Sequence, residues 1–302
     1  MKKIIKFILI IFIICVLILV YGRYIGTMNF ITKEYTLHHE SIPKGFDGLK
    51  IVHFSDLHYN RAITLTKVKS IVKEINLINP DIVVFTGDLI DRDVTLKTED
   101  YQALINVLSK INATYGKYAV LGNHDYEGDK DKIIELYNHS NFKYLDNDYD
   151  IIHDNMNEAI FIGGINTVSY NQDDIDKTMS YLKDNEDINY KVIIVHEPDI
   201  TDKIVNNYDV NLILAGHSHN GQIRLPFVGA LYTPPLSKKY YDNHYKVKDT
   251  DLYISSGIGV STINYRLFNP PSINFYRINK DWLVNIDKSF FFYNLRIIYY
   301  EK

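Results

Sequence analysis

The chain has 302 residues, of which 46 % are hydrophobic and 13 % aromatic, which is ample for a folded core and too apolar for a disordered protein. Residues 1–23 carry four basic and no acidic side chains, so 29 basic and 37 acidic side chains remain, and the body has a formal charge of −8. A general nucleic-acid binder is expected to be basic, and this balance therefore argues against a nuclease.

Residues 1–26 differ from the rest of the chain. The lysines Lys2, Lys3 and Lys6 precede a run without charge from Phe7 to Gly22. A helix of this length would roughly cross a bilayer. Basic residues ahead of the span predict a cytoplasmic N-terminus and a body on the outer side of the cell membrane. A cleavable secretory signal is the alternative, but no small-x-small site follows the apolar run, which favours a single-pass anchor. A buried core helix fits so uniformly apolar a segment poorly.

A spacer with a first strand region is expected over residues 27–48, ahead of one domain over 49–302. Short β-branched runs that end in loops then alternate with amphipathic stretches. Strand-to-loop segments are predicted at 49–58, 81–92 and 118–125, and helices at 64–80, 98–112 and 128–140. This alternation predicts a largely parallel sheet covered by helices.

The second half of the domain is richer in strands. A hairpin is predicted over 149–165 with its turn at 155–157, followed by a helix at 173–185 and strands at 190–198, 210–219, 221–226, 252–260 and 272–278. The predicted fold is therefore an α/β, four-layer α-β-β-α sandwich of two mixed sheets. The loop 237–249 is either a solvated hairpin, which is favoured, or a substrate rim, and the aromatic stretch 290–300 is a closing strand or a membrane contact.

The stretch "LAGHSHNGQIRLP", residues 214–226, places His217 and His219 one residue apart between glycines. In an extended segment, side chains at i and i+2 point the same way, so both imidazoles can aim at one point. By itself the pair is equally consistent with a turn or with two ordinary polar side chains.

Further residues of the types that bind metals occur at four other places where a predicted strand runs into a loop. They are Asp56, His58, Asp88, Asn123, His124 and His196, in addition to the histidine pair. Each has an ordinary explanation, such as a helix cap, a turn or a core histidine. Together they predict one pocket, because the carboxyl ends of strands gather on one edge of an α/β sheet.

The chemistry of the set suits divalent manganese, iron or zinc, because it contains carboxylates, an amide and imidazoles but no thiolate. Three Asp or Asn and four His side chains of this set would make seven ligands, which are too many for one tetrahedral ion and suit two ions that share one carboxylate. Two such ions would leave the pocket positively charged, so that it attracts phosphate and acidifies a bridging water.

The ordered motifs D-x-H, G-D-x-x-D-R, G-N-H-D, H and G-H-x-H, over residues 49 to about 260, resemble those of the calcineurin-like metallophosphoesterase superfamily. "GHSHNGQIRLP" and "SSGIGVSTINYRLFNPPSINFYRI" are most similar to its membrane-anchored bacterial branch of YaeI-like and YkuE-like proteins. The resemblance implies one ion held by Asp56, His58, Asp88 and His219, and a second held by Asp88, Asn123, His196 and His217.

The resemblance also implies roles for three neighbouring residues. His124 would contact the phosphate and protonate the leaving oxygen, Asp91 would orient its ring, and Arg92 would touch the phosphate; a surface ion pair of Asp91 and Arg92 is the alternative. The chain departs from the branch at Asn220, where glycine is usual. Asparagine accepts left-handed backbone, so the turn is expected to survive.

The function expected from these features is a membrane-tethered, two-metal phosphodiesterase or pyrophosphatase, in which a metal-bridging hydroxide attacks phosphorus. Lipid or wall phosphoesters of the cell envelope are the expected substrates, and no nucleic acid is expected as a partner. A phosphoprotein phosphatase is the enzymatic alternative, favoured by "GDLIDR" but disfavoured by the anchor and by "GNHD" in place of "GNHE". A non-catalytic, metal-stabilised envelope domain would be expected to have lost a ligand.

Overall fold

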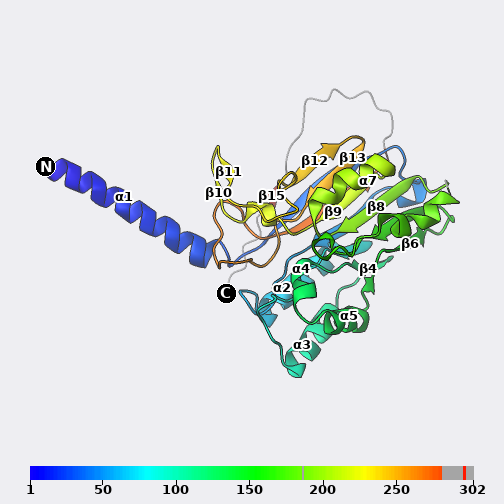
Figure 1. The fold of residues 1–302 in the computed structure, drawn as a ribbon, viewed down its shortest axis with the longest axis horizontal. Helices are drawn as coiled ribbons and strands as arrows, with labels where there is room; N and C mark the ends of the chain where they lie inside the picture. The colour runs from blue at the N-terminus through cyan, green and yellow to red at the C-terminus, as the bar shows by residue number, and fades with distance from the viewer. Residues whose placement is uncertain (186, 281–294, 297–302) are drawn as a thin grey trace.

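The computed structural model describes residues 1–185, 187–280 and 295–296. Two sheets pack face to face with helices on their outer sides, and one long helix projects from the domain (Figure 1). The first sheet has the order β15-β1-β14-β2-β3-β4-β5 and the second the order β12-β13-β9-β8-β7-β6. Both contain parallel and antiparallel pairs, which confirms the predicted four-layer sandwich of mixed sheets.

The first sheet contains the predicted parallel unit. Its strands are β2 (Leu49–Phe54), β3 (Ile82–Phe85), β4 (Gly116–Ala119) and β5 (Lys143–Tyr144). The helices between them are α2 (Leu65–Ile78), α3 (Thr98–Leu108), α4 (Asn123–Glu127) and α5 (Lys130–His139). Thr64 caps α2 by accepting the Lys67 N–H, as the threonine ahead of the apolar pattern predicts.

Two chain ends complete this sheet. β1 (Ile31–His38) lies in the predicted first strand region and runs parallel to β14 (Ser272–Asn279), which is antiparallel to β2. β15 (Leu295–Arg296) pairs antiparallel with β1. The closing strand predicted over 290–300 otherwise falls outside the described residues.

The second sheet has a parallel centre and antiparallel edges. Its strands are β6 (Asp148–His153), β7 (Ala159–Gly164), β8 (Tyr190–Val195), β9 (Leu212–Ala215), β12 (His244–Val247) and β13 (Thr250–Ile254). β12, at the end of the loop 237–249, forms a hairpin with β13, as the hairpin interpretation predicts, and no residue of the loop lines the cavity described below. β10 (Arg224–Leu225) and β11 (Gly229–Ala230) form a separate small hairpin.

The helices over the second sheet are short. The single helix predicted at 173–185 is wrong in extent: α6 (Ile175–Thr178) is followed by a 3-10 turn over Ser180–Lys183. The Thr178 hydroxyl donates to the Asp174 carbonyl, and serine and threonine compete in this way with a continuing helix. α7 (Thr201–Asn207) lies between β8 and β9.

Three apolar layers hold the elements together. One lies between the two sheets and includes Ile51, Val84, Val192, Leu214 and Tyr276. The other two lie between each sheet and its helices. With both faces covered, the parallel strands are fixed relative to one another, and so are the loops at their carboxyl ends.

The projecting helix is α1 (Lys2–Val20), which continues as a π-helical turn over Tyr21–Ile25. None of the residues of α1 is buried, which excludes the core-helix interpretation. Together with the π-helical turn, the span Lys2–Ile25 has 24 residues and would measure about 36 Å at 1.5 Å per residue, against a hydrocarbon core of about 30 Å. This part of the chain is therefore long and apolar enough to anchor the protein in a membrane.

Candidate metal centre

All seven predicted ligands lie at one edge of the sandwich, in loops that follow β2, β3, β4, β8 and β9. Five of them have left-handed backbone, which side chains other than glycine rarely adopt, with φ between 43° and 65°: Asp56, His58, Asp88, His217 and His219. Strained backbone of this kind clusters at functional sites, where the surrounding structure holds it in place. Here it turns side chains from three loops, those after β2, β3 and β9, toward one pocket.

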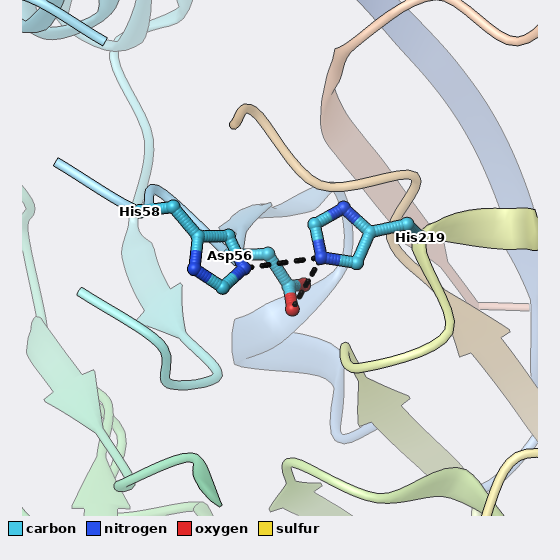
Figure 2. A group of neighbouring side chains, drawn as sticks. All are labelled: Asp56, His58 and His219. Carbon is cyan, nitrogen blue, oxygen red and sulfur yellow. Dashed lines mark hydrogen bonds and ion pairs between the residues drawn. The ribbon is translucent and has the colours of Figure 1, made fainter. Parts of the chain in front are cut away.

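The first group of ligands consists of Asp56, His58 and His219, all buried (Figure 2). The Nε2 atoms of His58 and His219 lie 3.1 Å apart, and His219 Nε2 is 3.4 Å from Asp56 Oδ1. The two rings stack at a centroid distance of 5.1 Å. Three potential ligand atoms therefore face one small space.

Asp88 connects this group to a second one. Its Oδ2 atom lies 3.7 Å from His58 Nε2 and 3.3 Å from His196 Nε2, whereas its Oδ1 accepts the backbone N–H of His124 at 2.8 Å. His196 is oriented by its other nitrogen, since Nδ1 lies 2.6 Å from the Thr86 carbonyl. Such a contact behind an imidazole is typical of metal ligands. Asp88 thus lies between His58 and His196, and Asp56 offers a ligand atom within 4.8 Å of those of Asp88 and His196.

Asn123 and His217 line the same cavity as Asp88, and the His217 ring lies 5.0 Å from that of His196, centroid to centroid. Asn123 Oδ1 is buried and has no hydrogen-bond partner among the described residues, which is costly for an amide oxygen. The Nε2 atom of His217 lies 2.8 Å from the Pro235 carbonyl, so this nitrogen is the donor and Nδ1 keeps its lone pair. Unpaired oxygen and nitrogen lone pairs around a buried carboxylate are what a divalent cation requires, and the residues fit such an ion.

The electrostatics of the site also suit a cation. Burial lowers the pKa of His58 to about 3 and holds that of His219 well below its ordinary value, which keeps both rings neutral. Burial, with Asp88 adding to it, raises the pKa of Asp56 to about 6. Burial would raise the pKa of Asp88. The charges of His196, His124 and His58 instead hold this pKa well below its ordinary value, so Asp88 stays ionised. His58, His219 and Asp88 are thus in the forms that ligate metals. Burial would lower the pKa of His196, but Asp88 holds this pKa well above its ordinary value, so His196 must lose a proton when a metal binds.

His124 lies beside the first group, with its ring edge-on to His58 at a centroid distance of 4.7 Å. Asp91 lies behind both rings: its Oδ1 is 3.9 Å from His124 Nδ1 and its Oδ2 is 3.5 Å from His58 Nδ1. The distance to His124 is longer than a hydrogen bond, so the predicted orienting contact is not formed in this structure. A role for Asp91 in positioning these rings stays a prediction.

The alternative of a surface ion pair between Asp91 and Arg92 is wrong. Asp91 is buried, and its carboxylate accepts from Arg61 Nη1 at 2.8 Å. Arg92 instead donates to Glu127 Oε2 at 2.8 Å, at the edge of the cavity. The reason is the loop after β3, which turns Asp91 inward and leaves Arg92 facing α4.

The ligands open into a cavity of about 660 Å³. The candidate ligands among its lining residues, which we call its floor, are Asp88, Asn123, His217 and His219, with His124 beside them. The lining also includes the polar group of Arg92, Glu127 and Tyr170, in which the tyrosine hydroxyl donates to Glu127 at 2.8 Å. Its apolar members are Ile223, Leu231, Tyr232, Pro234, Pro235 and Ile263. The cavity therefore combines a cation-binding floor with both polar and apolar lining residues.

Sequence reasoning missed three buried charged residues around the ligands. Asp125 accepts the backbone N–H groups of Asp88, Leu89 and Gly122 at 2.8–2.9 Å and so fixes the loops after β3 and β4 to each other. Glu197 accepts from Thr167, Val168 and Ser169. Asp125 and Glu197 each directly follow a predicted site histidine, and this adjacency was the signal available.

Arg266 is the third missed residue and is fully buried. It donates to the carbonyl oxygens of Ser256, Gly259 and Asn269, and its Nη2 lies 3.2 Å from His219 Nδ1. It ties the loop after β13 to the one that carries His219. Asn220 has φ 47° and ψ 33°, so the expected left-handed turn survives without glycine.

Metal binding is expected to stabilise the protein strongly. An ion at 100 times its dissociation constant adds about 2.7 kcal/mol, which raises the melting temperature of a domain this size by roughly 5–10 °C. The shift should shrink below pH 6, because Asp56, with its pKa raised to about 6, must lose its proton before it can ligate. Thermal unfolding of chelator-treated protein with and without added manganese, at several pH values, measures both effects. An unchanged melting temperature at neutral pH would contradict the metal assignment.

Comparison with known proteins gives a consistent picture. The calcineurin-like phosphoesterase family matches residues 49–221. The uncharacterized metallophosphoesterase YkuE of Bacillus subtilis is 36 % identical over 259 residues, covering 85 % of this chain and 88 % of that protein. YkoQ of the same organism is 30 % identical, over 86 % of this chain and 97 % of its own length. A zebrafish (Danio rerio) transmembrane protein with a metallophosphoesterase domain is 26 % identical over 76 % of this chain and 52 % of its own length.

Proposed function

The chain belongs to the calcineurin-like phosphoesterase family, and from this premise we propose that it hydrolyses phosphodiesters or pyrophosphates with the help of two divalent metal ions. The observation that carries the proposal is the position of Asp88, within 3.7 Å of His58 on one side and 3.3 Å of His196 on the other. A carboxylate shared by two groups of ligands is the arrangement that two-metal sites require.

Each ion has its own set of ligands in this proposal. Asp56, His58 and His219 hold the first ion and Asn123, His196 and His217 the second, with Asp88 common to both. When bound, the two ions supply positive charge that attracts the phosphate and lowers the pKa of the attacking water. The metals are manganese, iron or zinc, which prefer this mixture of oxygen and imidazole ligands.

The chain's own residues supply the rest of the chemistry. His124 reaches the cavity floor beside the ligands and donates a proton to the leaving oxygen as general acid. Asp91, behind the rings of His58 and His124, positions them through its charge. Arg92, at the cavity edge, orients the phosphate; its partner Glu127 holds the guanidinium in place until substrate binds.

The substrate class is tested with two phosphodiesters of different size. Since the body is acidic, hydrolysis of bis(p-nitrophenyl) phosphate in the presence of manganese is expected to exceed cleavage of DNA, and chelation should abolish both. The measurement is the initial rate on each substrate at physiological salt. Efficient DNA cleavage under those conditions would favour a nuclease, and activity confined to phosphoproteins would favour the phosphatase alternative.

We place the domain on the outer side of the cell membrane, where lipid and cell-wall phosphoesters are its substrates. The support is the position of Lys2, Lys3 and Lys6 ahead of the apolar span, since basic residues stay on the cytoplasmic side. A protease added to intact spheroplasts is expected to digest the domain. Protection of the domain in spheroplasts, with digestion only after lysis, would place it in the cytoplasm.

A further inference from the structure

The side of the domain next to α1 carries an unusual concentration of exposed apolar side chains. The hairpin β10–β11 and the loop 261–268 make up this side, which we call the membrane-proximal face. Its exposed apolar side chains are Leu225, Phe227, Val228, Ile263 and Phe268. Figure 1 shows the hairpin at the end of the domain from which α1 projects. Contiguous exposed apolar surface on a folded domain marks a contact with another apolar phase.

This face is tied directly to the helix. The Tyr265 hydroxyl donates to the Ile18 carbonyl at 3.0 Å, and the backbone N–H of Arg266 donates to the Gly22 carbonyl at 2.9 Å. Gly22 is needed for this contact, because a Cβ there would lie 2.2 Å from the Tyr265 ring. The loop therefore lies against the last turns of the helix and cannot swing freely away from it.

The contact with α1 also sets the depth of the loop. Arg23 and the two tyrosines beside it, Tyr21 and Tyr24, are of the types that lie at the headgroup level of a bilayer. Ile18, which Tyr265 contacts, is about one helical turn further toward the hydrocarbon than Gly22. If α1 spans the bilayer, the loop 261–268 lies at the headgroup level.

The hairpin is fixed to the same loop at its base. The Gln222 side-chain amide donates to the carbonyl oxygens of Ser261, Ile263 and Tyr265, and its oxygen accepts the Ser261 N–H. The backbone N–H of Arg224 donates to the Leu267 carbonyl at 2.9 Å. Helix, loop and hairpin thus form one continuous surface.

The tip of the hairpin presents an aromatic ring where a small residue is usual. Pro226 and Phe227 occupy the centre of a turn closed by the Val228 N–H and the Leu225 carbonyl at 3.2 Å, and Phe227 has φ 66°. This position of such a turn favours glycine. Phe227 is nevertheless fully exposed and Val228 is 70 % exposed. A strained turn therefore carries two apolar side chains that do not pack in the core of the domain.

We propose that the membrane-proximal face inserts into the headgroup region of the bilayer that α1 spans, and that the cavity thereby receives phosphoesters with a lipid tail directly from the membrane. Ile263 of the loop and the residues that flank the hairpin, Ile223, Leu231 and Tyr232, form an apolar wall of the cavity. A phosphate at the ligands can thus be joined to an apolar chain that leaves along this wall toward the bilayer. This inference rests on the proposed function and specifies its substrate as an amphiphile.

The insertion is tested without reference to activity. Cys15 is the sole cysteine, so a nitroxide spin label can be placed at Phe227→Cys in a Cys15→Ser background, with the full chain in phosphatidylcholine–phosphatidylglycerol nanodiscs. The control is Met156→Cys, an exposed apolar position in the turn between β6 and β7, at the opposite sheet edge. The label at 227 should be several-fold less accessible to a water-soluble nickel chelate, and more accessible to oxygen, than the label at 156. Equal accessibility, or spin–spin coupling between two copies at 227, would overturn the proposal.

The substrate class is tested by placing charge on the tip, with Phe227→Asp and Val228→Asp combined and Met156→Asp as the matched control. Hydrolysis of hexadecyl p-nitrophenyl phosphate in vesicles should fall about tenfold or more, because binding at a membrane surface scales with the buried apolar area. Hydrolysis of soluble bis(p-nitrophenyl) phosphate should stay within about twofold, since neither tip residue lines the cavity. An equal effect on both substrates would refute the lipid-tail assignment. If the wild type hydrolyses neither substrate, the proposed function itself fails, whereas the spin-label result still decides the insertion.

Discussion

Replacing Asp88 by asparagine is expected to lower the rate of phosphodiester hydrolysis by roughly three orders of magnitude, because the metals contribute several kcal/mol of charge stabilisation in the transition state. Asp88 Oδ2 faces His58 and His196, and its pKa is held well below the ordinary value, so it carries a full charge at neutral pH. The amide is similar in size but neutral. Both ions should therefore bind more weakly, which metal analysis of the purified variant measures together with the rate.

Two further variants make this prediction specific to Asp88. His58→Ala should mainly empty the first site, since His58 belongs to only one group of ligands. Asp131→Asn, the same change at an exposed position in the first turn of α5, should leave metal content and rate unchanged. Two full equivalents of metal in Asp88→Asn would contradict its place between the ions.

Replacing His124 by alanine is expected to lower kcat by about 10²- to 10⁴-fold while both ions remain bound, which is the typical contribution of a general acid. His124 lines the cavity floor, and its backbone N–H, which the mutation keeps, is the group that bonds Asp88. The loss should depend on the leaving group, because an alkoxide needs a proton and a nitrophenolate hardly does. Rates on a series of esters with leaving groups of increasing pKa measure this dependence.

Three outcomes of that series are distinguishable. A nearly normal rate for the most acidic leaving groups and a large loss for alkyl esters supports proton donation. An equal loss across the series would mean that His124 acts by binding phosphate, and a loss of metal would mean that it is structural. His139→Ala, at an exposed histidine at the end of α5, is the matched control and should be indistinguishable from the wild type.

The sequence predicts the layers of the fold, and the edge at which the candidate ligands meet, for one physical reason. Parallel strands with buried faces read as β-branched runs, and ligands such as Asp56 and His196 directly follow such runs, so the sheet itself brings them to one edge. What local patterns miss is pairing between distant segments. β1 and β14 are paired although more than 230 residues separate them, and only the folded sheet shows it.

The charge partners at the site could not be read from the sequence for the same reason. Asp91 and Arg92 are neighbours in the chain, but Asp91 pairs with Arg61 and Arg92 pairs with Glu127, because adjacent side chains leave a loop in different directions. Arg266 lies in no metal-binding motif and contacts His219 only through the loop after β13. The membrane-proximal face likewise depends on contacts between α1 and a loop about 240 residues further along the chain.

The dependence of activity on bound metal tests the central claim most directly. Chelator-treated full-length protein is titrated with manganese, and hydrolysis of bis(p-nitrophenyl) phosphate is followed as a function of the equivalents bound. The two-metal account predicts no hydrolysis without metal and a maximal rate only when two equivalents are bound. Full activity in the metal-free protein, or a rate that is already maximal at one equivalent, would contradict it.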